Sequence, residues 1–318
     1  MSVSTDVSTQ KTVGRIKAGS TLGKYIRYKA LVIMFLPGLI YYIVFHYLPM
    51  YGLIISFKDY RILDGVMASP WVGLKHFKAA FASTEFWSVF NNTLILSGFK
   101  LIFNFPAPII LSLLLNEVYN MKFKKIVQTI TYLPHFLSWV VLSGILIDFL
   151  SPGSGPLNMI LSTIGIKPIY FVGSRVWFRQ VLIVSSIWKG IGWGTIVYLA
   201  ALSGVNPELY EACKIDGAGK MKQIIHVTLP AISPVIVIML IFEVGHMVND
   251  DFDQIFNLYN PAVYSVGDVL STYIYRMGLE NMLYSYTSAI GLFKNLIAFG
   301  LVVGTNYISK RFSEYGLW

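Results

Sequence analysis

Long apolar runs alternate with short polar intervals along almost the whole chain. An α-helix needs about 20 mostly apolar residues to cross a bilayer, and six runs are long enough. The pattern therefore predicts an all-α membrane protein with six transmembrane helices, at Ala30–Phe57, Phe86–Leu115, Ile126–Ile147, Val181–Val205, Ala231–Asn249 and Ser285–Ser309. Pro106 and Pro108 are expected to kink the second span, because proline lacks a backbone N–H donor.

The polar intervals are too short to hold a soluble domain. We expect one membrane domain, residues 30–312, between a cytoplasmic N-terminal segment, 1–29, and a cytoplasmic tail, 313–318. The first span follows basic residues, as the apolar part of a signal peptide does. It is too long for one and lacks a small-residue cleavage site, so we interpret it as an uncleaved anchor.

The fourth and fifth spans are separated by a polar island, residues 206–230, with the sequence NPELYEACKIDGAGKMKQIIHVTLP. The island begins with a strong helix signal. Asn206 is a favoured N-cap, Pro207 takes the first helical position, and Glu208 and Glu211 lie in the first turn, where acidic side chains suit the helix dipole.

Two glycines, Gly217 and Gly219, are expected to end this first helix. A second short helix is predicted from about Lys220 to Thr228, before Pro230. Neither helix is long enough to cross a bilayer. Such a pair of short amphipathic helices lies on the membrane surface or docks into another protein.

Composition and charge support this arrangement. Hydrophobic residues make up 55% of the chain and charged residues 13%, against about 25% charged in soluble domains. Basic residues gather in four places that lie on one side of a six-span protein, which predicts that both termini and the island are cytoplasmic. These 14 of the 25 basic residues are Lys11, Arg15, Lys17, Lys24, Arg27, Lys29, Lys122, Lys124, Lys125, Lys214, Lys220, Lys222, Lys310 and Arg311. The net charge of +9 therefore reflects topology and requires no nucleic acid.

No catalytic or metal-binding motif stands out in the sequence. There is no HExxH or GxSxG, no cluster of Cys and His at metal spacing, and the single Cys213 excludes a disulfide within the chain. The glycine-containing stretch 19–25 lacks the spacing of a phosphate loop. We therefore expect no enzyme activity, metal or cofactor on this chain, and transport driven by ATP would need an ATPase on another polypeptide.

The polar island resembles the EAA loop of permease subunits in bacterial binding-protein-dependent ABC importers, in which EAA is followed by DGA and then LP. The matching residues are Glu211, Ala212, Asp216, Gly217, Ala218, Leu229 and Pro230. Cys213 replaces the second alanine, and Ile224 stands where phenylalanine is common. The N-terminal spans and the ending FSEYGLW most resemble LplB-type permeases, which are associated with complex oligosaccharides and polysaccharide fragments.

This resemblance implies a type I ABC importer permease fold, located in the bacterial cytoplasmic membrane. It implies four kinds of partner: a second permease subunit, favouring a heterodimer; a cytoplasmic ATPase dimer that carries ATP and Mg; an extracellular solute-binding protein; and an oligosaccharide. The island would dock into the ATPase, with Glu208, Glu211 and Asp216 meeting basic groups there. Ala212 and Gly217 would allow close backbone approach.

Charged residues within the spans are a second candidate site, because such groups usually face a cavity or a partner. Counted at about 1.5 Å per residue, Lys189, Glu243 and Lys294 lie roughly 9–14 Å from the outer ends of their spans, and Lys100 lies roughly 21 Å deep. Lys189, Glu243 and Lys294 form either a buried ion network or, with the lysines facing a cavity, a path for an anionic sugar such as a uronate.

Polar and aromatic residues of the fourth and fifth spans are further candidates for the sugar path. Glu243, His246 and Asn249 share one face of the fifth span. Trp188, Trp193 and Tyr198 are spaced five residues apart in the fourth, so at most two share a face. Aromatic rings would stack on sugars while amides and carboxylates bind hydroxyls, although membrane-interface or packing roles explain the rings as well.

Two other functional classes remain as alternatives. A secondary transporter would need ion sites within the membrane and usually repeated halves, and no repeat relates the first and last three spans. An intramembrane enzyme would need a nucleophile and base or paired carboxylates, and the only candidates, Glu243 and Asp148, lie on different helices. A permease for another class of solute is also compatible with the pattern.

Overall fold

The computed structural model describes residues 28–247 and 252–313. The expected N-terminal segment up to residue 27, Asn249 and most of the C-terminal tail lie outside the described residues. No β-strand forms in the described part, where Lys58 and Trp71 make an isolated antiparallel bridge. The chain divides into two compact units, residues 1–53 and 54–318.

The N-terminal unit is a single helical run in its described part. It comprises α2 (Lys29–Tyr42), a π-helical turn η1 (Ile43–Tyr47) and the short α3 (Leu48–Met50). The run continues as a 3-10 helix, η2 (Tyr51–Phe57). Apolar side chains point to all sides of α2, as expected for a helix that lies in a membrane.

The larger unit contains the remaining long apolar helices. Within the described residues, five helical runs of the chain are long and apolar enough to cross a bilayer, or six if one bent pair counts as a span. The elements of this unit are α4 (Gly65–Ala68), α5 (Lys75–Ala82), α6 (Thr84–Asn104), α7 (Pro106–Asn116), α8 (Met121–Tyr132), η3 (Leu133–Phe136), α9 (Trp139–Phe149), α10 (Pro156–Thr163), α11 (Phe178–Ser203), α12 (Pro207–Ile215), α13 (Lys220–Gln223), η4 (Ile224–Thr228), α14 (Leu229–His246), α15 (Phe252–Leu258), η5 (Pro261–Val263), α16 (Tyr264–Gly267), α17 (Leu270–Tyr275), η6 (Arg276–Glu280) and α18 (Tyr284–Ser313).

The second span forms where the sequence predicts it, as α6 followed by α7 over Thr84–Asn116. Ser83 caps its start by accepting a hydrogen bond from the Phe86 backbone N–H at 3.2 Å. The α-helix is interrupted at Phe105, directly before Pro106, whose missing N–H falls at the first position of α7. The proline is thus placed where it costs little.

The third span differs from a single helix over Ile126–Ile147. Here α8 and η3 are followed by α9, and the two parts meet at an angle of 107°. Pro134 lies in η3, and Ser138 starts α9 as an N-cap that accepts from Val141 N at 3.3 Å. A proline followed by a good capping residue favours ending one helix and starting another, which explains the break.

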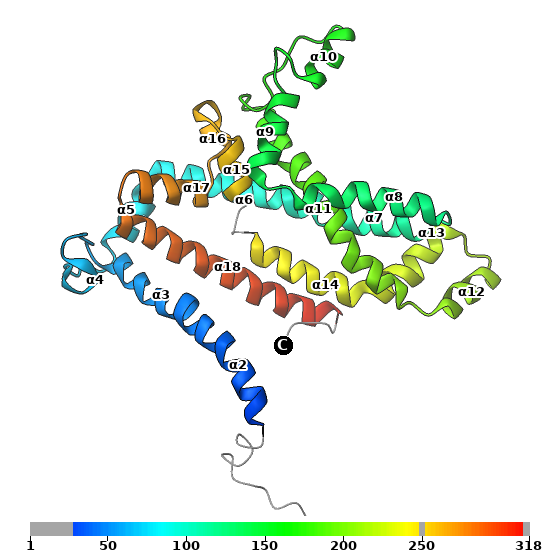
Figure 1. The fold of residues 1–318 in the computed structure, drawn as a ribbon, viewed down its shortest axis with the longest axis horizontal. Coiled ribbons are helices and arrows are strands. Elements are labelled where there is room, and N and C mark those ends of the chain that lie inside the picture. Colours follow the sequence, from blue (N-terminus) through cyan, green and yellow to red (C-terminus); the bar gives the residue numbers. More distant parts are fainter. Residues whose placement is uncertain (1–27, 248–251, 314–318) are drawn as a thin grey trace, which may run out of the picture. The chain divides into compact units, whose positions relative to one another are not determined.

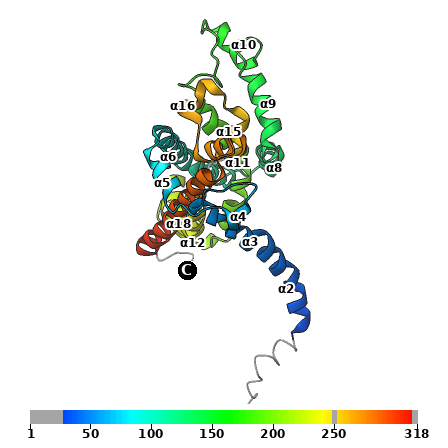
Figure 2. The ribbon, with the colours of Figure 1, turned by 90° about the vertical axis from the view of Figure 1, so that its left-hand side faces the viewer.

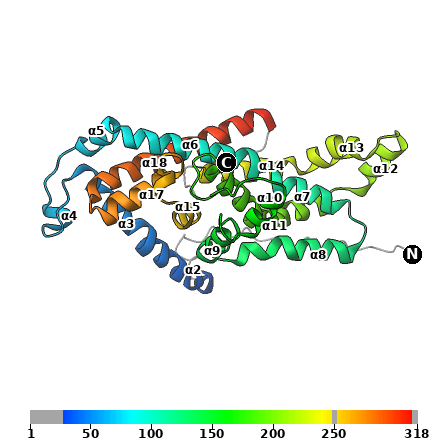
Figure 3. The same cartoon turned by 90° about the horizontal axis from the view of Figure 1, so that it is seen from above.

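The best-packed part of the larger unit lies at the end of the bundle where residues 252–283 fold back onto α6 and α11. Phe178, Leu182, Ile255 and Val269 have no exposed surface there. Gly267 lies so close to the Phe178 ring that a Cβ atom would come within 2.2 Å of it. Figures 1 and 3 show α4, α5 and α17 at one end of this unit and α12 and α13 at the other. Helices α9 and α10 project from the bundle in Figures 1 and 2.

Candidate functional site: an exposed polar loop and an intramembrane pocket

The polar island folds as a helix, a bend and a second helix, as its sequence predicts. The Asn206 side chain accepts from the Glu208 backbone N–H at 3.0 Å and so caps α12. This cap is favourable by about 1 kcal/mol relative to alanine. Pro207 occupies the first helical turn, where no backbone donor is needed.

The bend after α12 depends on the backbone of Gly217. Its φ angle is +74°, in the left-handed region that glycine enters without a steric penalty. The Ala218 N–H donates to the Cys213 carbonyl at 2.9 Å, which closes the end of the helix. Apart from its two chain neighbours, no described residue has an atom within 4 Å of where a Gly217 Cβ would stand. The position therefore requires glycine for its backbone conformation and leaves the surface open.

The second helix of the island is longer than expected. Instead of ending near Thr228, α13 passes through the π-helical turn η4 into α14, and Lys220–His246 forms one continuous run. Pro230 does not interrupt the run, because it falls in the first turn of α14. The two arms of the island are fastened together by a 3.0 Å hydrogen bond between the hydroxyl groups of Tyr210 and Thr228.

The outer surface of the island is exposed and partly apolar. Glu208, Glu211, Ala212, Asp216 and Gly217 are all exposed, while Ala218 and Leu229 are half-buried and Pro230 is exposed. Ile215 is 86% exposed and Met221 68% exposed. At its base, Lys220 forms a 2.5 Å ion pair with Glu117, which follows α7. The island is therefore anchored to the bundle and presents both carboxylates and apolar side chains outward.

Four of the predicted substrate-path residues line one pocket. Lys100 of α6, Trp193 and Tyr198 of α11 and Glu243 of α14 border a cavity of about 280 Å³, together with Asn104. Lys100 donates to the Gln254 Oε1 atom at 2.8 Å. Tyr198 is 1% exposed and Trp193 50% exposed. The pocket thus combines an ammonium group, a carboxylate, an amide and two aromatic rings.

Asn104 also lines this pocket, although the sequence pattern alone did not identify it as a candidate. Its Nδ2 atom donates to Ser186 Oγ at 2.7 Å, while its Oδ1 atom is buried and has no partner among the described residues. Lys100 and Asn104 are four residues apart and so share a face of α6. A polar side chain one turn from an intramembrane lysine was the signal that could have identified it.

Lys189 lies at the break in the third span. Its ammonium group donates to the carbonyls of Pro134, His135 and Leu137 and lies 5.4 Å from the centre of the Trp139 ring. Among the described residues it makes no ion pair, so Lys189 is not part of the buried ion network that was one of the two expectations for Lys189, Glu243 and Lys294. The reason is that the break leaves carbonyl groups without helical donors, and Lys189 satisfies them.

The other predicted path residues are dispersed. Trp188 borders a separate apolar groove beside Phe149 and Trp177. Lys294 is 8% exposed and donates to Ser271 Oγ at 2.5 Å. His246 is exposed near the end of α14, and Asn249 lies outside the described residues. The His135 ring stacks on Trp193 with 4.5 Å between ring centres.

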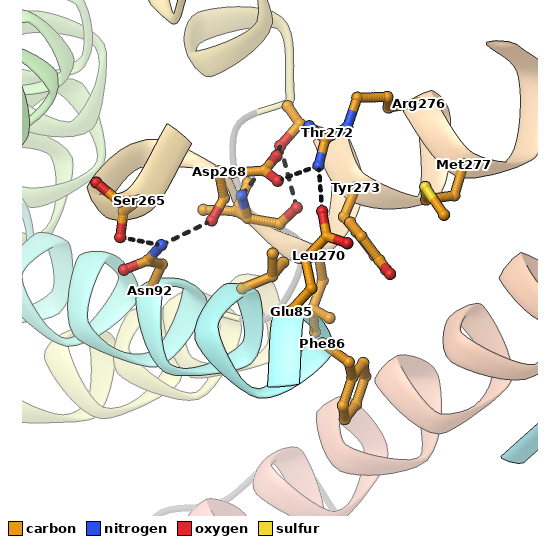
Figure 4. A network of polar contacts seen from close by, with 12 residues as sticks. Glu85, Phe86, Asn92, Ser265, Asp268, Leu270, Thr272, Tyr273, Arg276 and Met277 are labelled. Atoms are coloured by element: carbon orange, nitrogen blue, oxygen red, sulfur yellow. Dashed lines mark hydrogen bonds and ion pairs between the residues drawn. The ribbon is translucent and has the colours of Figure 1, made fainter. Parts of the chain in front are cut away.

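A polar network at the opposite end from the island holds α16, α17 and η6 against α6 (Figure 4). Arg276 contacts Asp268 at 2.6 Å and Glu85 at 3.2 Å, and Asp268 is 2% exposed. Burial lowers the pKa of Arg276, but the hydrogen bond and charge of Asp268 outweigh it and raise the pKa above its ordinary value. Asn92 of α6 donates to the backbone carbonyls of Ser265 and Asp268.

Comparison with known proteins assigns the chain to a family. Residues 104–314, more than half of the chain, match the model of the binding-protein-dependent transport system inner membrane component. The chain belongs to this family. It is therefore a transporter permease with several membrane-spanning helices, and the matched residues include the whole island.

Two curated relatives from Bacillus subtilis (strain 168) match along nearly their whole length. The permease is 42% identical to Protein LplB, over 92% of each chain. It is also 42% identical to the polygalacturonan/rhamnogalacturonan transport system permease protein YteP, over 93% of this chain and 92% of that protein.

A solved structure matches the fold. A chain of a bacterial ABC transporter involved in the import of the acidic polysaccharide alginate superposes with a TM-score of 0.86 and 42% identity, over 92% of this chain and 99% of that chain. The same kind of transporter, in complex with an alginate pentasaccharide-bound periplasmic protein, gives a TM-score of 0.87 and 41% identity. The predicted class, an all-α ABC importer permease, is confirmed.

Proposed function

We propose that this chain is one half of the permease of an ATP-driven importer of acidic oligosaccharides. The observation that carries the proposal is the pocket of Lys100, Asn104, Trp193, Tyr198 and Glu243. Aromatic rings suit the apolar faces of sugar rings, the amide suits hydroxyl groups, and an ammonium group suits a uronate carboxylate. The names of YteP and of the alginate transporter, both about 42% identical, support the same substrate class.

In this proposal the EAA loop couples the permease to a separate ATPase dimer, which binds ATP and Mg. The exposed carboxylates of Glu208, Glu211 and Asp216 would meet basic groups of a groove in that ATPase, and the exposed Ile215 would enter its apolar floor. An ATPase dimer offers two grooves and this chain one loop, so a second permease is needed, and we propose a different one. Both termini and the EAA loop are cytoplasmic, and an extracellular binding protein delivers the sugar from the other side.

The test is reconstitution of the co-purified complex in liposomes with its binding protein. We expect ATP hydrolysis to be stimulated by the binding protein loaded with oligogalacturonate or another oligouronate, and labelled sugar to accumulate inside. A neutral oligosaccharide of the same length is the matched control. Equal transport of the neutral sugar would contradict the proposed specificity for acidic sugars. Transport that proceeds without ATP would indicate a secondary transporter.

A further inference from the structure

Helix α8 carries an open groove that none of the preceding functions uses. The groove has a volume of about 470 Å³ and is lined by Lys122, Lys125, Ile126, Thr129 and Ile130. Counted from Lys122, these residues stand at positions i, i+3, i+4, i+7 and i+8, so they form one face of the helix. Helix α8 runs along the margin of the larger unit in Figures 2 and 3.

The chemistry of this face changes along the helix. Its beginning carries two lysines, while its continuation is apolar: Ile126 is 57% exposed, and Ile130 and Leu133 are each 64% exposed. The opposite face packs on α11, where Gly192 allows contact with the Thr131 backbone. The groove therefore pairs a basic entrance with an exposed apolar floor, on a helix of a membrane protein.

The positive charge at the entrance is uncompensated by the described part of the chain. Neither Lys122 nor Lys125 forms an ion pair there, whereas Lys220, at the same end of the bundle, is paired with Glu117. The first turn of α8 contains no acidic residue, and cations at a helix N-terminus oppose the helix dipole. Two like charges three residues apart also repel each other. An anion that bridges the two ammonium groups would relieve both effects.

We propose that this groove binds one anionic phospholipid, with its phosphate between Lys122 and Lys125 and an acyl chain along Ile126, Thr129 and Ile130. A free phosphate would use the lysines but leave the isoleucines exposed, so the two-part character of the groove favours a lipid. The proposal is independent of the transported sugar. The proposed orientation adds only that the lipid comes from the cytoplasmic leaflet, whose anionic headgroups attract basic residues.

The test is native mass spectrometry of the co-purified complex in detergent, titrated with phosphatidylglycerol or phosphatidylcholine. One basic side chain near an anionic lipid surface changes affinity about fivefold, so two give about 30-fold. We expect phosphatidylglycerol to bind about 30-fold more tightly than phosphatidylcholine, and the double variant Lys122→Gln/Lys125→Gln to lose that preference.

Lys124→Gln is the control, because it removes one positive charge from the same helix at a residue that does not line the groove. It should keep the preference, and the soluble headgroup glycerophosphoglycerol should not displace the lipid at equal concentration. Equal binding of the two lipids, an equal loss in Lys124→Gln, or displacement by the headgroup would overturn the proposal. So would a disulfide between Ile130→Cys and a cysteine of the second permease, because a protein would then cover the groove.

Discussion

The backbone conformation of Gly217 leads to a prediction for a single substitution at this residue. Its φ of +74° costs a side-chain-bearing residue about 1–2 kcal/mol, and a β-branched residue more. We expect Gly217→Val to distort the bend and lower both sugar transport and coupled ATP hydrolysis. Sugar binding by the free extracellular protein should be unchanged.

The control for this change is Gly219→Ala. Gly219 has a φ of −68°, and in the described part of the chain no atom beyond its two neighbours lies within 4 Å of where its Cβ would stand, so alanine fits. Both variants should reach the membrane at normal levels, as measured by immunoblotting. Normal transport by Gly217→Val would show that the bend does not transmit ATP hydrolysis.

Neutralising the two charged residues of the pocket should have opposite effects on the uptake of an acidic sugar. Lys100→Gln removes attraction to a carboxylate, and Glu243→Gln removes repulsion. For oligouronate uptake we expect Lys100→Gln to lower kcat/KM about tenfold or more, because a charge-assisted hydrogen bond is worth about 1.5–3 kcal/mol. Glu243→Gln should leave kcat/KM unchanged or raise it. Uptake assays with a neutral oligosaccharide provide the comparison. A parallel fall for both sugars, together with a lower Tm, would indicate a structural role.

Residue patterns predicted part of the pocket but not its assembly. Lys100 and Glu243 were identifiable because charge is rare inside a span, and Trp193 and Tyr198 because rings suit sugars. Which of these side chains meet depends on how three helices pack. Charge and depth within a span do not by themselves predict which residues line the pocket. Lys189 is also a lysine within a span, but its ammonium group donates to the carbonyls of Pro134, His135 and Leu137.

At the scale of elements, the broken third span depends on a side chain from another helix. Lys189→Met would leave the carbonyls at the break without their shared donor, and an unsatisfied buried polar group costs about 1–3 kcal/mol. We expect a lower Tm for the purified complex and partial recovery with Lys189→Arg, which keeps the charge and the donors. An unchanged melting curve for Lys189→Met would show that water molecules donate hydrogen bonds to these carbonyls instead.

The helices themselves were largely predictable, and their breaks were not. The sequence places the second span at Phe86–Leu115, and the helices cover Thr84–Asn116, because apolar length and capping residues are local signals. Pro134 and Ser138 also indicate a break locally, but they do not predict its angle of 107°, which lies between a helix packed on α11 and a helix packed on α15. The reverse error occurred at Pro230, which reads as a stop but lies in the first turn of α14, where a proline is tolerated.

For the whole molecule, the predicted orientation can be tested by cysteine labelling. Cys213 is the natural cysteine and lies half-buried in α12 of the EAA loop. Ser154 and Ser265 are exposed and lie on the opposite side in the six-span topology. An impermeant maleimide should label Ser154→Cys and Ser265→Cys in intact cells, and Cys213 only after permeabilisation. Labelling of Cys213 in intact cells would reverse the topology.

The π-helical turn η4 sets the rotation of α13 relative to α14 about their common helix axis. The run Lys220–His246 is 27 residues long, or about 40 Å at 1.5 Å per residue, so it extends from the island to the part of α14 that borders the pocket. A π turn holds about one residue more than an α turn. Without that residue, the face that α13 presents would turn by about 100° relative to the face of α14 that borders the pocket. A single residue in the π turn therefore determines which face of α13 is aligned with the face of α14 that borders the pocket.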